Sequence, residues 1–120
     1  MRDLLNWFEI PVLDIERAAT FYGAIFATKL EINRGDGFSS AIFPYEGKIG
    51  GGLVAGEGYL PNPQGSLLYL NANPDLNIIL KRIKAAGGQV IKAKTDLGEN
   101  GFFALFLDTE GNRVALHSVN

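Results

Sequence analysis

Two side chains of this 120-residue chain, Glu9 and His117, are the best suited to acid–base chemistry. A carboxylate and an imidazole at one ligand can act as a general acid and base, and they can also orient the ligand. In the alternative interpretation, His117 is a half-exposed residue near the C-terminus and Glu9 pairs with Arg113 or a lysine. Tyr69 offers a phenol that could assist the pair. The candidate catalytic residues are therefore Glu9, His117 and Tyr69.

A second set of residues is suited to holding a ligand without reacting with it. The ring of Trp7 could stack on an aromatic ligand, and the guanidinium of Arg113 could pair with an anionic one. Gly52 ends a run of three glycines that is not followed by the Lys-Ser/Thr of a phosphate loop, so the run favours a close backbone approach or a bulge beside a cleft. The candidate ligand-binding residues are Trp7, Gly52, Asn71 and Arg113.

Strand alternation places most of these candidates on one side of the expected sheets, because successive side chains of a strand point to opposite faces. In the first strand, Phe8 and Ile10 lie on the face opposite Glu9. The candidates that share the inner face are Trp7 and Glu9 in the strand at 7–12, Tyr69 and Asn71 in the strand at 67–72, and Arg113 and His117 in the strand at 113–119. We expect this face to line a cleft.

The order of elements repeats along the chain, once in residues 6–56 and again in 66–119. Each unit begins with a strand and an amphipathic helix and continues with three strands, and the glycine- and proline-rich stretch 56–65 connects the units. The sequence therefore predicts an α+β domain over residues 1–120, in which two βαβββ modules form a curved mixed sheet around a cleft, with the helices outside. The later strands are expected near 28–34, 38–45 and 51–55 in the first module, and near 89–94, 102–107 and 113–119 in the second.

Capping residues delimit both expected helices. Asp14 is a suitable N-cap for the first, because its carboxylate can accept hydrogen bonds from the free amides of the first turn. For the second, Asn73 can cap and Pro74 fits the first helical position, while Gly87 with Gly88 ends the helix. The apolar stripes expected to face the core are Ile15, Ala18, Ala19, Tyr22 and Phe26 in the first helix, and Leu76, Ile79, Leu80 and Ile83 in the second.

Composition limits the classes of partner. The net charge is −2 and the basic residues are scattered, so no nucleic acid partner is expected. The chain has no cysteine, which excludes disulfides, thiolate nucleophiles and thiolate metal sites. The start is too short and too polar for a signal-peptide core, and no apolar run is long enough to span a bilayer. We expect a soluble cytoplasmic protein with a small-molecule ligand and no membrane partner.

Four short motifs follow one another along the chain. The opening run at 8–18 continues with Phe21-Tyr22, and the closing run at 106–116 contains the turn Asp108-Thr109-Glu110-Gly111-Asn112, with threonine where proline is usual. Between them lie Tyr69-Leu70-Asn71 and Ala85-Ala86-Gly87-Gly88. Together these motifs resemble the glyoxalase-like subgroup of the vicinal oxygen chelate superfamily, which contains glyoxalase I, extradiol dioxygenases, fosfomycin-resistance enzymes and bleomycin-resistance proteins. The resemblance covers nearly the whole chain, and it implies paired βαβββ modules and a homodimer.

The resemblance also implies where a metal would bind. In the metalloenzymes of that superfamily, the first and last strands of each module supply His, Gln or Glu ligands, and the metal holds two vicinal oxygens of the substrate. The matching positions of this chain are Trp7, Gly52, Ala115 and Leu67 or Leu68. None of these side chains can ligate a divalent cation of that kind. Neither a metal ligand nor a cofactor is therefore predicted.

Two functions follow from these residues. The first is binding of a small molecule in the cleft without the usual metal, similar in principle to bleomycin-resistance proteins, which sequester a ligand in a groove. The alternative is a lyase, isomerase or dioxygenase-type enzyme of the superfamily that uses Glu9 and His117, either as an acid–base pair or in a rebuilt divalent-metal site. The sequence leaves open whether the cleft forms within one chain or between two.

Overall fold

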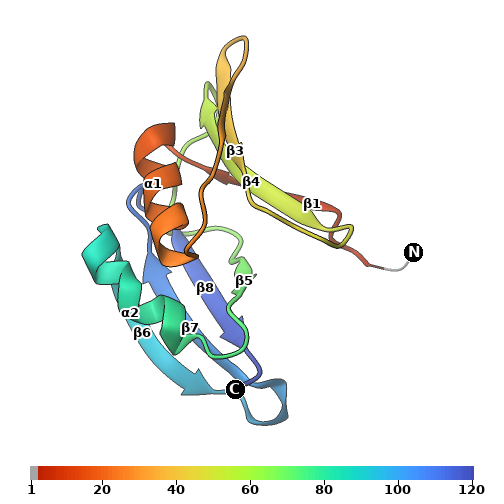
Figure 1. Ribbon diagram of the computed structural model, residues 1–120, viewed down its shortest axis with the longest axis vertical. Coiled ribbons are helices and arrows are strands. Elements are labelled where there is room, and N and C mark those ends of the chain that lie inside the picture. The colour runs from red at the N-terminus through yellow and green to blue at the C-terminus, as the bar shows by residue number, and fades with distance from the viewer. Residues whose placement is uncertain (1–2) are drawn as a thin grey trace.

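The structure, a computed structural model, describes residues 3–120 and contains two helices and eight strands in these residues (Figure 1). The first module consists of β1 (Trp7–Pro11), α1 (Ile15–Ile25), β2 (Ile32–Arg34), β3 (Phe38–Ile42) and β4 (Gly50–Gly56). The second consists of β5 (Tyr69–Asn71), α2 (Asn77–Ala86), β6 (Gln89–Asp96), the short 3-10 helix η1 (Gly98–Asn100), β7 (Phe102–Leu107) and β8 (Arg113–Ser118). Neither helix is long and apolar enough to cross a membrane.

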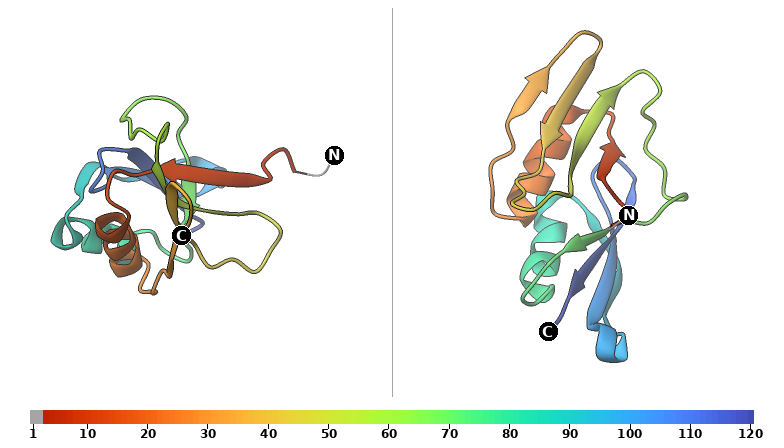
Figure 2. Two further views of the ribbon diagram at one scale, coloured as in Figure 1. Left: turned by 90° about the horizontal axis from the view of Figure 1, so that it is seen from above. Right: turned by 90° about the vertical axis from the view of Figure 1, so that its right-hand side faces the viewer.

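The two modules have the same topology. The strands are ordered β1-β4-β3-β2 in the first sheet and β5-β8-β7-β6 in the second. In each sheet the first strand of the module runs parallel to the last, and the other neighbours are antiparallel. Figures 1 and 2 show two separate sheets, that of the first module in the upper part of Figure 1 and that of the second in the lower part, with α1 and α2 packed against each other on the same side of the molecule. The predicted α+β class and the βαβββ order are confirmed.

One hydrophobic core joins both modules. Alternation is confirmed for β1, because Phe8, which packs against the core, and Ile10, which is buried in it, lie opposite Trp7 and Glu9. Tyr22 in α1 meets Phe43, which follows β3, edge-on at 5.5 Å between ring centroids, and meets Phe106 of β7 at 6.4 Å. These contacts hold the helix against both modules. Residues that are almost fully buried come from both helices and both sheets: Val12, Phe21, Tyr22, Ile25, Leu53, Leu76, Ile83, Phe106 and Leu116.

The ends of the helices test the capping predictions. The Asp14 carboxylate accepts a hydrogen bond from the N–H of Arg17 at 3.1 Å, so the first N-cap is confirmed. Gly87 ends α2 in the left-handed conformation with φ of 109°, which a residue without a Cβ adopts at low cost. Of the predicted stripes, Phe26 and Leu80 are only partly buried, and the rest are buried.

The predicted start of the second helix is wrong. Helix α2 begins at Asn77, three residues after Pro74. The Asn73 side-chain oxygen does not cap the helix, because it accepts the N–H of Val119 at 2.8 Å. The N–H of Leu76 donates instead to Ser118 Oγ at 3.0 Å, so β8 supplies the acceptor that we expected from the local sequence. The strand expected at 28–34 is also shorter and covers only Ile32–Arg34.

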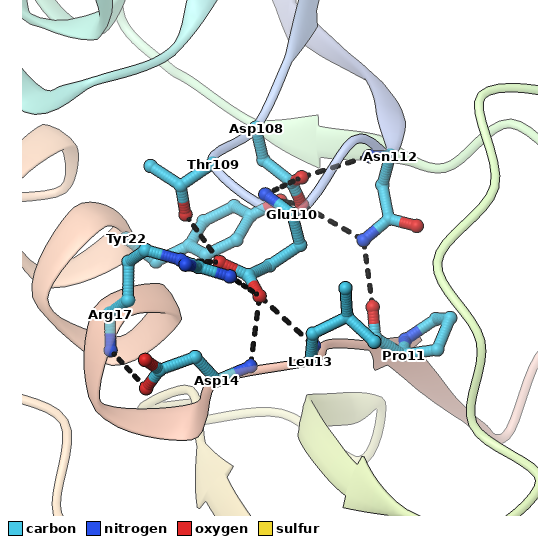
Figure 3. A network of polar contacts seen from close by, with 9 residues as sticks. All are labelled: Pro11, Leu13, Asp14, Arg17, Tyr22, Asp108, Thr109, Glu110 and Asn112. Carbon is cyan, nitrogen blue, oxygen red and sulfur yellow. Dashed lines mark hydrogen bonds and ion pairs between the residues drawn. The ribbon is translucent and has the colours of Figure 1, made fainter.

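The turn between β7 and β8 is a buried polar network (Figure 3). Asp108 accepts a hydrogen bond from the hydroxyl of Tyr22 at 2.7 Å and from the N–H groups of Glu110 and Asn112 at 2.8 and 2.9 Å. Burial, together with the Asp108 carboxylate, raises the pKa of Tyr22 well above its ordinary value. The phenol therefore remains a hydrogen-bond donor, and it ties the centre of α1 to the second module.

Glu110 connects the same turn to the junction between β1 and α1 (Figure 3). Its side chain is fully buried, and Oε1 accepts the N–H groups of Leu13 and Asp14, both at 2.9 Å. Arg17 donates from Nε at 2.7 Å and from Nη2 at 2.9 Å, and the hydroxyl of Thr109 donates at 2.9 Å. Burial alone would raise the pKa of Glu110, but these donors outweigh it and lower the pKa to about 2.

Asn112 completes the connection. Its Nδ2 donates to the carbonyl of Pro11, the last residue of β1, at 2.8 Å. Its Oδ1 accepts the N–H of Asn62, in the segment between the modules, at 3.0 Å. One five-residue turn thus fixes the end of β1, the start of α1 and the connecting segment.

Because the pKa of Glu110 is lowered, the free energy of unfolding should fall at acidic pH. The ionised carboxylate contributes fully above pH 4.5, its ordinary pKa, and the contribution is lost as the pH falls toward about 2. The free energy of unfolding should therefore drop by about 3 kcal/mol over this range from this group alone. In Glu110→Gln, urea unfolding at pH 7 should show a loss of about 3 kcal/mol, because the donors lose their anionic acceptor. The pH dependence between 5 and 2, measured over the same series, should become shallower.

Glu31→Gln is the matched control, because Glu31 is exposed. This variant should keep the stability and the acid dependence of the unmodified chain. If the free energy of unfolding changed equally with pH between 5 and 2 in Glu110→Gln and in the unmodified chain, the assigned role of Glu110 would be contradicted.

Candidate functional site

Two cavities lie along the junction between the modules. The larger has a volume of about 1120 Å³ and lies between β5, the loop joining β3 to β4, and the end of α1. The smaller has a volume of about 230 Å³ and lies between the second half of β1, the start of β8 and the connecting segment. Phe8 and Leu68 line both cavities, so these two side chains separate them.

The larger cavity has mainly aromatic and aliphatic walls. Phe43 stacks on Phe8 at 6.0 Å between ring centroids and meets Phe26 edge-on at 6.4 Å. Tyr45 and Tyr69 add two further rings. The polar side chains on the wall are few, namely Thr28, Glu46 and Asn71. A cavity of this size and composition is typical of sites that bury small organic molecules and orient them through a few polar groups.

The smaller cavity has charged and polar side chains beside apolar ones on its walls. Glu9 of β1 and Arg113 of β8 contribute opposite charges from opposite modules. The remaining polar side chains come mostly from the connecting segment, namely Asn62, Gln64 and Ser66, together with Asn112 of the β7–β8 turn.

The structure places the predicted catalytic residues at separate points. Glu9 Oε1 accepts a hydrogen bond from the hydroxyl of Tyr59 at 3.1 Å, and this hydrogen bond with its anionic acceptor raises the pKa of Tyr59. His117 Nε2 lies 2.6 Å from the carbonyl oxygen of Asn100, in η1, to which it donates as the N–H tautomer. Glu9 lines the smaller cavity and His117 lines neither of the two. Within one chain, they are not brought to one ligand.

The other candidates divide between the two cavities or lie outside them. Tyr69 and Asn71 line the larger cavity, and Arg113 joins Glu9 at the smaller one. Trp7 lies edge-on to Tyr45, at 6.1 Å between ring centroids, and lines neither cavity. Gly52 is buried within the first sheet, also outside both.

Gly52 instead permits the close backbone approach that the sequence suggested. A Cβ at this position would lie 2.7 Å from the carbonyl oxygen of Ala41 in the neighbouring strand. That contact is shorter than real Cβ atoms make, so a side chain here would force the strands apart.

Several wall residues were missed by the sequence argument. Tyr45 and Glu46 lie in the β3–β4 loop, because the strand expected at 38–45 ends at Ile42, and in a loop no periodicity assigns a direction to a side chain. Phe26 was assigned to the core, and it is only partly buried because it also borders the larger cavity. For Tyr45, the only feature of the sequence that could have indicated a wall residue is its aromatic side chain just after a strand.

A family model and a relative of known sequence both match this chain. Residues 4–116 match the model of the glyoxalase/bleomycin resistance protein/dioxygenase superfamily. A glyoxylase-like domain-containing protein of Didymella fabae is 29% identical over 123 residues, which cover 93% of this chain and 91% of that protein.

Solved structures share the fold. A glyoxylase/bleomycin resistance protein/dioxygenase domain from Frankia sp. EAN1pec superposes with a TM-score of 0.75 at 19% identity, covering 98% of both chains. A glyoxalase/bleomycin resistance protein/dioxygenase family enzyme from Burkholderia phytofirmans PsJN gives a TM-score of 0.72 at 22% identity, covering 96% of this chain and 98% of that one.

The residues at the positions where metalloenzymes of this fold bind a cation do not fit a metal. These positions are Trp7, Gly52, Ala115 and Leu67 or Leu68. An indole, a hydrogen, a methyl and an isobutyl group offer no lone pair to a divalent cation. Among residues 3–120, no three His, Asp or Glu side chains are grouped closely enough to replace them.

The wall of the larger cavity predicts a contrast between two neighbouring glycines. A Cβ at Gly51 would overlap the ring of Phe8, which is packed against the core, so Gly51→Ala should cost about 1–3 kcal/mol of stability. A Cβ at Gly50 would meet the ring of Tyr45 at 2.8 Å, but that ring is largely exposed and can swing away. Gly50→Ala should therefore cost less than about 1 kcal/mol. Urea unfolding of the two variants measures the difference, and equal costs would contradict the assigned packing of Phe8.

Proposed function

Because the chain belongs to the glyoxalase/bleomycin resistance protein/dioxygenase superfamily, we propose that it is a small-molecule-binding member that works without a divalent metal. The observation that carries the proposal is the cavity of about 1120 Å³ at the module junction, whose walls are aromatic and aliphatic. Burial of apolar ligand surface supplies the affinity at such a site, and a small number of polar groups sets the orientation.

The chemistry of the wall favours a flat, largely apolar ligand. Phe43 presents its ring between those of Phe8 and Phe26, and stacked or edge-on contacts with such rings favour an aromatic partner. Thr28 and Asn71 can exchange hydrogen bonds with a hydroxyl or carbonyl group on that ligand.

The separate partners of Glu9 and His117 support binding over acid–base catalysis by this pair. General acid–base catalysis needs both groups within hydrogen-bond reach of one reacting molecule. Glu9 is held by Tyr59 and His117 by the carbonyl of Asn100.

Homodimerisation is the second part of the proposal. The face of the first sheet that lies opposite the core carries apolar side chains with substantial exposure: Trp7 at 40%, Phe38 at 49% and Ile42 at 38%. Several large apolar side chains exposed on one sheet face favour association through that face. Covering this face with a second copy would remove it from water, in agreement with the homodimer that the family resemblance implies.

The binding function predicts a specific loss in Tyr69→Ala. Tyr69 lines the larger cavity and is 54% exposed, so its truncation removes ligand contact with little effect on the core. With 2-naphthol as probe, isothermal titration calorimetry should show saturable binding to the unmodified chain and binding about tenfold weaker in Tyr69→Ala. Chelator-treated protein should bind with the same Kd before and after addition of Mn²⁺ or Zn²⁺.

Ile78→Ala is the matched control, because Ile78 on α2 is 40% exposed and lines neither cavity. It should bind the probe as the unmodified chain does. Binding that requires a cation would overturn the metal-independent function, and an equal loss in both variants would overturn the assignment of the cavity.

The dimer predicts a difference between two exposed isoleucines. Sedimentation equilibrium at micromolar concentration should show a dimer for the unmodified chain. Ile42→Lys places a charge on the proposed interface and should raise the dimer dissociation constant by about tenfold or more. Ile91→Lys, at a position 46% exposed on β6, should leave association unchanged. A monomer for the unmodified chain would contradict the dimer.

A further inference from the structure

The smaller cavity holds two opposite charges that do not neutralise each other. Glu9 and Arg113 both line it, one from each module. Within residues 3–120, the ion pairs are those of Arg17, Arg34 and Lys94, so the charged atoms of Glu9 and Arg113 are more than 4.0 Å apart. Two such groups across one cavity leave room for a molecule that carries both complementary charges.

Each charge is in place for a ligand. The hydroxyl of Tyr59 occupies Oε1 of Glu9, which orients the carboxylate and leaves Oε2 free in the described part of the chain. Arg113 makes no side-chain hydrogen bond there, although its guanidinium carries five donors.

The other walls can support a small polar ligand. Gln64 and Ser66 face the cavity, and neither side chain has a hydrogen-bond partner among residues 3–120. Phe8 and Leu68 add apolar surface that can contact the carbon atoms of a ligand.

The volume limits the size of the ligand. At about 230 Å³, the cavity is smaller than the roughly 300–1,000 Å³ typical of pockets for drug-sized molecules. Its occupant must therefore be compact, with its two charges only a few bonds apart.

We propose that this cavity binds a small zwitterion of the amino acid class, with its ammonium group on Glu9 and its carboxylate on Arg113. A guanidinium and a carboxylate form short, charge-assisted hydrogen bonds, and the carboxylate of Glu9 accepts in the same way from an ammonium group. A ligand with only one charge would satisfy one wall and leave the other charge without a partner. The site is separate from the larger cavity, and it does not depend on the function proposed for that cavity.

Titration of ¹⁵N-labelled protein followed by NMR tests the proposal. The probes are glycine, 3-aminopropanoate and 4-aminobutanoate, which increase the separation of the charges one bond at a time. Propanoate and propylammonium at equal ionic strength are the singly charged controls. At least one zwitterion should cause saturable shifts in the amide signals of residues 9–10, 64–66 and 113–114. The singly charged probes should bind about tenfold more weakly or worse.

Variants identify the charges responsible. Glu9→Gln and Arg113→Gln should each weaken binding of the same zwitterion by about tenfold or more, and Arg113→Lys should retain part of the affinity because it keeps the charge. Glu31→Gln, at an exposed position that lines neither cavity, should bind as the unmodified chain does. The dispersed amide spectrum of each variant shows that it has folded.

Three results would overturn the proposal. These are singly charged probes that bind as tightly as the zwitterions, no saturable shift with any of the three zwitterions, and shifts confined to residues of the larger cavity. Loss of 2-naphthol binding would not affect it, since that probe reports on the other cavity.

Discussion

The fully buried carboxylate of Glu110 links the two halves of the chain. A carboxylate without solvent contact is strongly destabilising unless donors surround it, and removal of its partners from a buried pair typically costs about 3–5 kcal/mol. Here the donors come from the first module, as the backbone N–H groups of Leu13 and Asp14 and the guanidinium of Arg17. The second module can therefore satisfy this charge only when it is docked on the first in one orientation, so the position of each sheet relative to the other is tied to a single side chain.

The cavities depend on that docking. The same turn that carries Glu110 holds the end of β1 through Asn112 and Pro11, and holds the connecting segment through Asn112 and Asn62. These contacts bring the polar walls of the smaller cavity together from three distant parts of the sequence. The larger cavity follows from the same arrangement, because the β3–β4 loop and β5 approach each other only as far as the docked modules allow. The site is thus a property of the junction and of neither module alone.

Local features were predictable from the sequence and long-range features were not. The cap at Asp14 and the glycine at Gly87 act within one turn of their own helix, and both were predicted correctly. The start of α2 was wrong because Asn73 binds Val119, 46 positions away, a contact that outcompetes capping. The turn at 108–112 was predicted as a turn, but the partner of Glu110 at Leu13 lies 97 positions away. Alternation assigns Glu9 and Tyr69 each to one face of its own strand. It does not show how the two sheets are placed relative to each other, so it could not show that the two residues lie at different cavities.

The junction also explains why the cavities do not depend on the residues at the positions that the family resemblance assigns to metal ligands. The gap between modules is created by docking, which uses the buried turn, and the turn is independent of the residues that line the gap. The fold therefore forms with Trp7, Gly52 and Ala115 at the positions where the resemblance would put metal ligands. A wall of aromatic rings recognises a ligand through buried apolar area and ring contacts, which need no cation to organise them. Selectivity then rests with the few polar groups at the rims, which are carried by loops and strand ends that the core does not constrain.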